Sequence, residues 1–456
     1  MESAALEQRP SGVRHRVVAF AATLAVITYV DRVCISQAAP FIQEDLGLTS
    51  AQMGMAFSAF ALAYALFEVP GGWLGDWIGP RKVLMRIVVI WSVFTAATGY
   101  AWNAISLITT RLLFGAGEAG CFPNLAKTFM IWLPQAERAR AQAILWLSAR
   151  WAGAFTPLLV IWIMSFLSWR NTFVLFGSLG VIWAYFFYRY FRDRPRDHPG
   201  VNAAELALLE DGGHDDGASG NARVPWRELM MNRSVWLLWI QYFCLTYGWF
   251  FYVTWLPTYL NEVVGVELNR NAFALWLEGA LSGVFEPETM RRVFVAALAG
   301  VPLLFGGFGC IVCGVVSPRL AKRLKSEYTA RRILAVTGFT GASVLLVASF
   351  YIRDPLLAML AMGLASFCND LTMPGSWNTC MDLGGKFAGT VSGSMNMMGA
   401  FGGAVAPIAI GLILDATDRD WAIAFWLSGA IYFAGALCWL WLDPERSIAE
   451  PDASAT

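Results

Sequence analysis

The chain has 456 residues, of which 57% are hydrophobic and 14% are charged, and its mean hydropathy is +0.52. This composition excludes an ordinary soluble protein of this size and indicates a chain that folds in a lipid bilayer. The 33 basic and 33 acidic residues cancel, so the net charge gives no sign of a nucleic-acid partner and only the placement of charges is informative.

Apolar stretches of about 20 residues, the length that crosses a bilayer as a helix, occur in two groups of six. The first six begin near Val17, Gly54, Val83, Ala104, Ala139 and Thr172. After a charged, Gly/Asp-rich segment, the other six begin near Ser234, Val293, Ile333, Leu356, Ala388 and Trp421. The sequence therefore predicts an all-α membrane protein of twelve transmembrane helices in two six-helix halves. The stretch that starts at Val17 is too long for a signal-peptide core and is expected to remain as the first helix.

Basic residues in short loops set the expected orientation. Loops with Arg and Lys alternate with loops that are poor in them, which places both termini in the cytoplasm. The expected divisions are an N-terminal tail (1–16), a first bundle (17–192), a cytoplasmic linker (193–233), a second bundle (234–442) and a C-terminal tail (443–456). The outer loop 261–292 contradicts the charge rule because it contains Arg270, Arg291 and Arg292. Its apolar stretch, Phe273–Leu281, is expected to form an interfacial helix that can act as a lid.

A few ionisable residues fall inside the predicted helices, where a charge costs several kcal/mol unless it is paired or faces water. The six that form the candidate site are Asp31, Arg32, Arg111, Glu118, Arg150 and Asp370. Guanidinium groups can bind a carboxylate with two hydrogen bonds, and a desolvated carboxyl can load and release a proton. The alternative is that these residues are structural ion pairs, Asp31 with Arg32 or Arg111 and Asp370 with Arg150.

The spacing of Arg111 and Glu118 places both side chains on one face of the fourth predicted helix, about two turns apart. Glycines at 115, 117 and 120 allow a neighbouring backbone to approach this helix. This face is therefore expected to line a central cavity.

The eight cysteines lie mostly in apolar runs and are expected to be buried thiols. Cys310 and Cys313 form a C-x-x-C, but no second pair or histidine is near in the sequence. The three histidines, His15, His198 and His214, lie outside the predicted helices. We therefore expect no enzyme activity, no metal and no cofactor.

The segment Gly71–Lys82, between the second and third helices, contains glycines, an aspartate and two basic residues, which matches the loop signature of major facilitator transporters. Asp76 is expected to lie against the N-terminus of a neighbouring helix and to pair with Arg81 or Arg138, closing a cytoplasmic gate. A loop that only fixes topology would explain Arg81 and Lys82 but not Asp76.

Further motifs extend this likeness over nearly the whole chain, which resembles the anion:cation symporter branch of the major facilitator superfamily. That branch includes bacterial galactonate, glucarate and hexuronate transporters and vesicular glutamate and sialic acid carriers. The matching pieces are Tyr29–Arg32, Tyr64 with Val69–Trp73, Arg111–Pro123, Trp255–Tyr259, Trp377 and Gly393–Gly399.

The resemblance implies roles for individual residues. Asp31 and Glu118 match the acids that carry protons, and Arg32 and Arg111 match arginines that contact or position the anion. The positions that line the substrate cavity in the family correspond here to Tyr29, Tyr64, Trp377 and Asn396.

Two residues depart from the family pattern. Arg150 stands where sugar-acid carriers often have a neutral polar residue, and Asp370 adds an acid to the tenth helix. We include Arg150 among the candidate substrate contacts and Asp370 among the candidate proton carriers. These charges leave open a substrate that bears a positive group besides its carboxylate.

The expected function is proton-coupled symport of a small organic anion by alternating access, with a sugar acid such as a hexonate, hexarate or hexuronate implied by the resemblance. The expected setting is a bacterial inner membrane, in which the protein is a multi-pass monomer that binds no nucleic acid. The alternatives are an antiporter or uniporter for another carboxylate or a zwitterion, and a sensor that does not transport.

Overall fold

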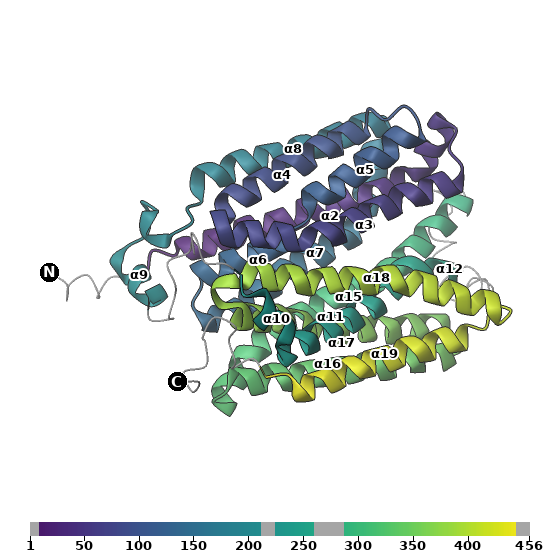
Figure 1. Ribbon diagram of the computed structural model, residues 1–456. Helices are drawn as coiled ribbons and strands as arrows, with labels where there is room; N and C mark the ends of the chain where they lie inside the picture. Colours follow the sequence, from purple (N-terminus) through teal and green to yellow (C-terminus); the bar gives the residue numbers. More distant parts are fainter. Residues whose placement is uncertain (1–8, 211–223, 260–286, 444–456) are drawn as a thin grey trace.

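The computed structural model describes residues 9–210, 224–259 and 287–443, and helices are the regular elements of these ranges (Figure 1). The first half contains α2 (Val13–Leu46), α3 (Ser50–Ile78), α4 (Pro80–Thr98), α5 (Ala104–Glu118), α6 (Cys121–Trp132), α7 (Gln135–Met164) and α8 (Trp169–Tyr190). The segment of chain that connects the two halves contains α9 (Ala203–Glu210) and α10 (Trp226–Met231). The second half contains α11 (Arg233–Phe250), α12 (Leu256–Tyr259), α15 (Pro287–Leu324), α16 (Glu327–Tyr351), α17 (Pro355–Gly384), α18 (Ala388–Ala416) and α19 (Trp421–Trp441).

Length and composition identify eight candidate membrane spans within the described ranges, one of which takes in both α17 and α18. The all-helical membrane fold is therefore confirmed, while the count of twelve crossings stays a prediction. The predicted interfacial helix Phe273–Leu281 and Arg270 lie outside the described residues. Arg291 and Arg292, expected in the outer loop, fall within α15, which begins at Pro287.

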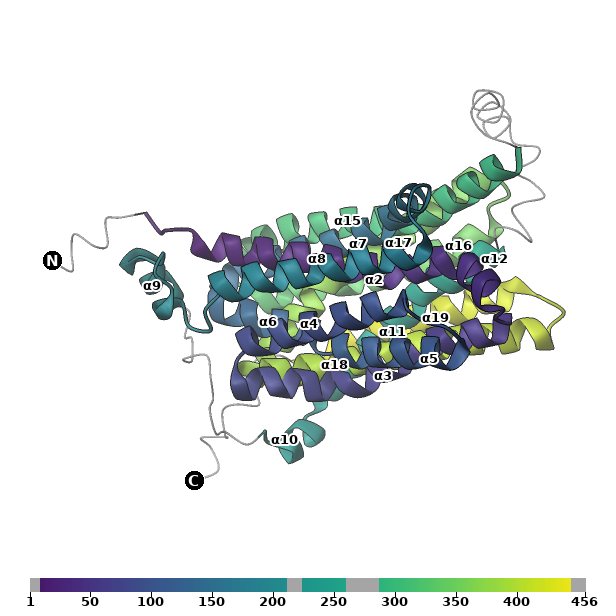
Figure 2. The ribbon, with the colours of Figure 1, turned by 90° about the horizontal axis from the view of Figure 1, so that it is seen from above.

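The two halves lie side by side as bundles whose long helices run in roughly the same direction (Figures 1 and 2). They meet most extensively along α3 with α18 and α7 with α15, and also along α6 with α18 and α7 with α17. The start of α2 and the end of α19 lie at the same end of the molecule, which we call the termini end. The interface between the halves is therefore the region in which a central site is expected.

The fourth predicted helix is broken into α5 and α6 at Gly120, where the backbone has φ of 82°. A residue with a side chain rarely adopts this left-handed conformation, and a Cβ atom at Gly120 would also meet the backbone of Gly71 on α3. The Asn124 amide fixes the break by donating to the carbonyls of Gly71 (2.9 Å) and Gly120 (2.7 Å). The predicted close approach at this glycine run is therefore present as a tight crossing of α3.

The linker helix α9 is attached to the first membrane helix through Glu205, a buried residue. Its carboxylate accepts hydrogen bonds from the backbone nitrogens of Val13 (3.2 Å) and Arg14 (3.1 Å) and from the Ser11 hydroxyl. Arg14 also forms two hydrogen bonds with Glu137, at the start of α7 (2.9 and 3.1 Å). Glu205 thus caps α2 from a segment nearly 200 residues away.

Replacing Glu205 with alanine should lower the free energy of unfolding at neutral pH by about 1–2 kcal/mol, because the N-terminal amides of α2 lose their acceptor. Burial would raise the pKa of Glu205, but hydrogen bonds from Ser11, Arg14 and Val13 outweigh burial and lower the pKa below its ordinary value of 4.5. The contribution of Glu205 is therefore complete above about pH 4.5 and is lost as the pH falls through the lowered pKa.

Thermal unfolding in detergent at several pH values measures this difference, with Glu228→Ala on the exposed face of α10 as the control. Equal melting temperatures for Glu205→Ala and the control at neutral pH would show that the cap does not stabilise the fold.

Candidate functional site

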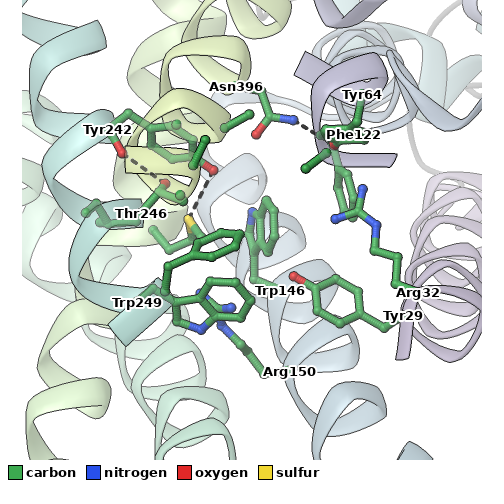
Figure 3. Close-up of a pocket in the computed structure, with 18 of the residues that line it drawn as sticks. Tyr29, Arg32, Tyr64, Phe122, Trp146, Arg150, Tyr242, Thr246, Trp249 and Asn396 are labelled. Atoms are coloured by element: carbon green, nitrogen blue, oxygen red, sulfur yellow. Dashed lines mark hydrogen bonds between the residues drawn. The ribbon is translucent and has the colours of Figure 1, made fainter. Parts of the chain in front are cut away.

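A central cavity of about 140 Å³, partly open to solvent, lies between the two halves (Figure 3). Helices α2, α3, α6 and α7 of the first half and α11, α17 and α18 of the second half contribute to its wall. Most of the lining is aromatic or aliphatic, and two guanidinium groups, those of Arg32 and Arg150, interrupt it.

Arg32 contributes one of these guanidinium groups from α2. Its Nε atom lies 2.5 Å from Oε1 of Glu118, a fully buried carboxylate on α5 that does not line the cavity. The guanidinium carbon lies 4.4 Å from the ring centre of Tyr64, which gives a cation–π contact. The buried Nη2 atom of Arg32 has no hydrogen-bond partner in the described structure, so this guanidinium retains an unused donor beside the cavity.

Asp31 and Arg111 lie behind the cavity wall and not in it. Both are buried, and the Arg111 guanidinium lies over the rings of Phe114 (4.3 Å) and Phe60 (5.1 Å). In the described structure, neither oxygen of Asp31 has a hydrogen-bond partner, and Nε and Nη1 of Arg111 also have none. Asp31, Arg111 and Glu118 nevertheless lie within electrostatic range of one another. The candidate residues of α2 and α5 thus share one buried region, of which only Arg32 reaches the cavity.

Arg150 and Asp370 form a bidentate ion pair that joins α7 of the first half to α17 of the second. The Nε to Oδ2 distance is 2.6 Å and the Nη2 to Oδ1 distance is 2.9 Å. The Asn369 amide donates a further bond of 2.7 Å to Asp370, and the Trp249 ring lies 4.5 Å from the Arg150 guanidinium. The pairing that the sequence suggested is confirmed, and Arg150 is the member that lines the cavity.

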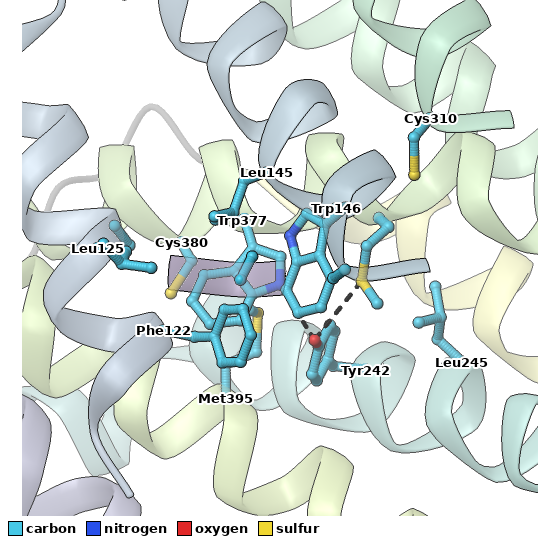
Figure 4. Packing of buried hydrophobic residues seen from close by; sticks show 14 of the residues in the cluster. Phe122, Leu125, Leu145, Trp146, Tyr242, Leu245, Cys310, Trp377, Cys380 and Met395 are labelled. Carbon is cyan, nitrogen blue, oxygen red and sulfur yellow. Dashed lines mark hydrogen bonds between the residues drawn. The ribbon is translucent and has the colours of Figure 1, made fainter. Parts of the chain in front are cut away.

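The other predicted cavity residues occupy different positions. Tyr29, Tyr64 and Asn396 line the cavity, and the Asn396 amide donates to the Tyr64 hydroxyl across the halves (2.9 Å). Trp377 does not line it. Its indole donates to the Tyr242 hydroxyl (3.0 Å), and its ring packs behind the wall with the aromatic residues shown in Figure 4. Trp377 therefore supports the cavity from behind.

Several residues of this region were not predicted. Trp146, Tyr242, Thr246 and Trp249 line the cavity, but no sequence signal separates them from the many other aromatic and hydroxyl residues of the helices. Glu68 on α3 is different, because an ionisable residue inside an apolar helix is itself a signal. It is completely buried beside the predicted motif that follows it.

Asp76 joins the halves at the termini end. Its carboxylate accepts hydrogen bonds from the backbone nitrogens of Gly389 (3.0 Å) and Thr390 (2.6 Å) and from the Thr390 hydroxyl (2.7 Å). These groups belong to the N-terminus of α18, which favours a negative charge. The predicted contact with a neighbouring helix N-terminus is confirmed. The structure also shows an ion partner that was not predicted: the Nζ atom of Lys127 lies 3.4 Å from Oδ1 of Asp76. The same ammonium group donates a hydrogen bond to the Lys386 carbonyl.

Arg138 and Arg81 contact different parts of the termini end. Arg138 on α7 lies 3.4 Å from Asp382 on α17 and so joins the two halves. Arg331 on α16 also binds Asp382, at 2.5 Å. The Arg81 guanidinium donates to the carbonyl of Tyr188 (2.6 Å) and lies over its ring, which joins α4 to α8 within the first half.

Among the described residues, no group of three or more His, Cys, Asp or Glu side chains is placed to hold a metal ion. The polar groups among the residues that line the described cavity are guanidinium, hydroxyl, amide and indole N–H groups. Such a set can bind an anion and its polar substituents by hydrogen bonds.

Comparison with known proteins gives consistent matches over the chain. The family model described as Major Facilitator Superfamily matches residues 21–407. A protein named as a probable sulfoacetate transporter from Cupriavidus necator is 34% identical over 444 residues, which cover 97% of this chain and 96% of that protein. A D-galactonate transporter from Escherichia coli O6:H1 is 30% identical over 445 residues, 95% of this chain and 96% of that one. A probable galactarate/D-glucarate transporter from Bacillus subtilis is 30% identical over 94% of this chain and 90% of its own length.

A solved structure shares the fold at low sequence identity. It is the proton:xylose symporter bound to 6-bromo-6-deoxy-D-glucose, which superposes with a TM-score of 0.67 over 95% of this chain and 96% of its own. The two sequences are 12% identical, so this likeness concerns the arrangement of the helices alone.

Proposed function

Because the chain belongs to the Major Facilitator Superfamily, we propose that it is a secondary active transporter that carries a small organic anion together with protons by alternating access. Its family and its relatives are membrane transporters. The protein is therefore a membrane transporter and not an enzyme. The observation that carries the proposal is the cavity between the halves, whose mostly apolar wall contains the guanidinium groups of Arg32 and Arg150.

The substrate class follows from the chemistry of the cavity and from the relatives. Two guanidinium groups favour one or two acid groups, such as carboxylate or sulfonate. Hydroxyl and amide groups from Tyr29, Thr246 and Asn396 can bind further oxygen atoms. We propose a sugar acid or another small organic acid, because relatives are named as transporters of sulfoacetate, galactonate, galactarate and glucarate.

Proton coupling is proposed to pass through the pair of Arg32 and Glu118. An anion that binds Arg32 competes with Glu118 for the guanidinium, and a buried carboxylate that loses its partner is stabilised by taking up a proton. Protonation in turn removes a negative charge close to the bound anion. Anion and proton therefore bind cooperatively, and the coupling free energy is the same in either order. Asp31 and Asp370 are further candidates for proton exchange.

The proposal also covers the orientation of the protein in the membrane and the side on which the cavity is closed in this structure. We propose twelve crossings, with both termini and the termini end on the cytoplasmic side of a bacterial inner membrane, and a monomer as the transporting unit. Asp76 and Arg138 then close the cavity to the cytoplasm, and their contacts with α18 and α17 break when the halves rock. Arg81 acts within the first half, by holding the start of α4 on α8.

Uptake into proteoliposomes tests the proposal. We expect an inward proton gradient to drive accumulation of at least one of sulfoacetate, D-galactonate, D-glucarate and a hexuronate, and a protonophore to abolish it. Exchange that does not depend on the gradient would instead indicate an antiporter or a uniporter. The absence of flux for the whole panel, including zwitterionic amino acids, would contradict transport of this class and favour a sensor.

A further inference from the structure

Glu68 on α3 is a buried carboxyl to which the proposed transport mechanism gives no role. It is 0% exposed, and neither of its side-chain oxygens has a hydrogen-bond partner in the described structure. An ionised carboxylate in such a place is costly, and a buried polar group without a partner requires an explanation.

The position of Glu68 connects it to both the cavity and the contact between the halves. Tyr64 lies one turn earlier on the same face of α3 and lines the cavity, where its hydroxyl accepts from Asn396 of α18 (2.9 Å). The carbonyl of Glu68 faces Gly393 of α18, so closely that a Cβ atom at Gly393 would lie 2.6 Å from it. Glu68 therefore lies where α3 of the first half packs on α18 of the second.

The groups that face the Glu68 carboxyl come from all sides. They are Tyr64 on its own helix, Arg32 on α2, Asn396 on α18 and the backbone of Gly120 between α5 and α6. Arg32 is the one cation among them, and its Nε already binds Glu118. A neutral carboxyl suits this environment, because the one nearby cation, Arg32, is already bound to Glu118 and a protonated carboxyl can donate to a neighbouring oxygen.

The balance of buried charge leads to the same conclusion. The central region holds three arginines, Arg32, Arg111 and Arg150, and four carboxyl groups, Asp31, Glu68, Glu118 and Asp370. If all seven were ionised, one negative charge would be in excess even before an anion entered. At least one of the four carboxyls must then be protonated for an anion to bind without a large desolvation cost. Of the four acids, Glu68 is the one that lies where α3 of the first half packs on α18 of the second.

We propose that Glu68 is a proton-exchanging carboxyl that adds one proton to each transport cycle. It holds the proton while α3 and α18 are packed together. When the halves separate at this contact, the bond between Tyr64 and Asn396 breaks, water reaches the carboxyl and the proton passes to the cytoplasmic side. The inference rests on the proposed function for its transport step, but the proton-binding site itself can be tested without a substrate.

The first test is infrared difference spectroscopy of the purified protein between low and high pH, without any substrate. Glu68→Gln keeps the shape of the side chain, and we expect it to lose one band of a protonated carboxyl that wild type shows. The control Glu327→Gln, an acid at the start of α16 paired with Arg331, should keep that band. Identical spectra for wild type and Glu68→Gln would overturn the proposal.

The second test is the proton-to-anion ratio, measured in proteoliposomes from the proton gradient that just balances an opposing gradient of sulfoacetate or D-galactonate. We expect Glu68→Gln to transport one proton fewer per anion than wild type, and Glu68→Asp and Glu327→Gln to keep the wild-type ratio. An unchanged ratio in Glu68→Gln would show that Glu68 carries no proton. If wild-type protein transports neither anion, the proposed function fails for these substrates, and the infrared result alone decides whether Glu68 binds a proton.

Discussion

Replacing Glu118 with glutamine is expected to reduce proton-driven accumulation of the anion strongly while exchange of anion across the membrane continues. Glutamine keeps the shape of the side chain but cannot take up a proton, and it leaves the Arg32 guanidinium without its ion partner at 2.5 Å. For each coupled proton that is lost, a gradient of one pH unit supports about tenfold less accumulation, because one unit corresponds to about 1.4 kcal/mol.

The measurement compares gradient-driven uptake with counterflow in the same proteoliposomes. Glu44→Gln, which replaces an exposed acid on α2, is the matched control and should behave as wild type. Uphill accumulation by Glu118→Gln with the wild-type dependence on pH would remove Glu118 from the coupling mechanism.

The second large effect is expected at the termini end, where Asp76→Asn should shift the protein toward conformations in which this end is open. The carboxylate accepts three hydrogen bonds from Gly389 and Thr390 and lies 3.4 Å from Lys127. Hydrogen bonds to a charged group contribute about 1.5–3 kcal/mol each. Because about 1.4 kcal/mol changes a population ratio tenfold, the open fraction should rise at least about tenfold.

Spin labels at Lys82 and Lys322, exposed positions in different halves, can measure this opening as a longer distance between the labels. The native thiols interfere little because all eight are buried or half-buried. Asp415→Asn, a change at an exposed position near the opposite end of α18, should leave the distance distribution unchanged. An unchanged distribution in Asp76→Asn would show that the carboxylate does not hold the halves together.

The helical membrane fold could be predicted because a transmembrane helix is encoded locally, in the length of an apolar stretch. The break at Gly120 could not. The glycine run indicated close packing, but the left-handed backbone depends on Gly71 of α3, which meets Gly120 only in the folded chain. The capping of α2 by Glu205 escaped prediction for the same reason, since donor and acceptor are far apart in the sequence.

The candidate site was predictable as a set of charges, because each buried ionisable residue is conspicuous in an apolar helix. Which of them reach the cavity was not predictable. Arg32 and Arg150 line the cavity and Arg111 does not, a difference that depends on how α2, α5 and α7 are rotated about their axes. The partner Lys127 of Asp76 was also missed, because Lys127 on α6 reaches Asp76 on α3 only in the folded chain.

The ion pair between Arg150 and Asp370 has a consequence for how the specificity of this protein can evolve. Removing one member of a buried pair leaves an uncompensated charge and costs about 3–5 kcal/mol, whereas replacing both by apolar residues is often nearly neutral. A mutation at Arg150 that would suit a new substrate is therefore penalised while Asp370 is retained. Changes at these two positions should be epistatic: variants of this protein that evolve a neutral residue at one position should also have a neutral residue at the other.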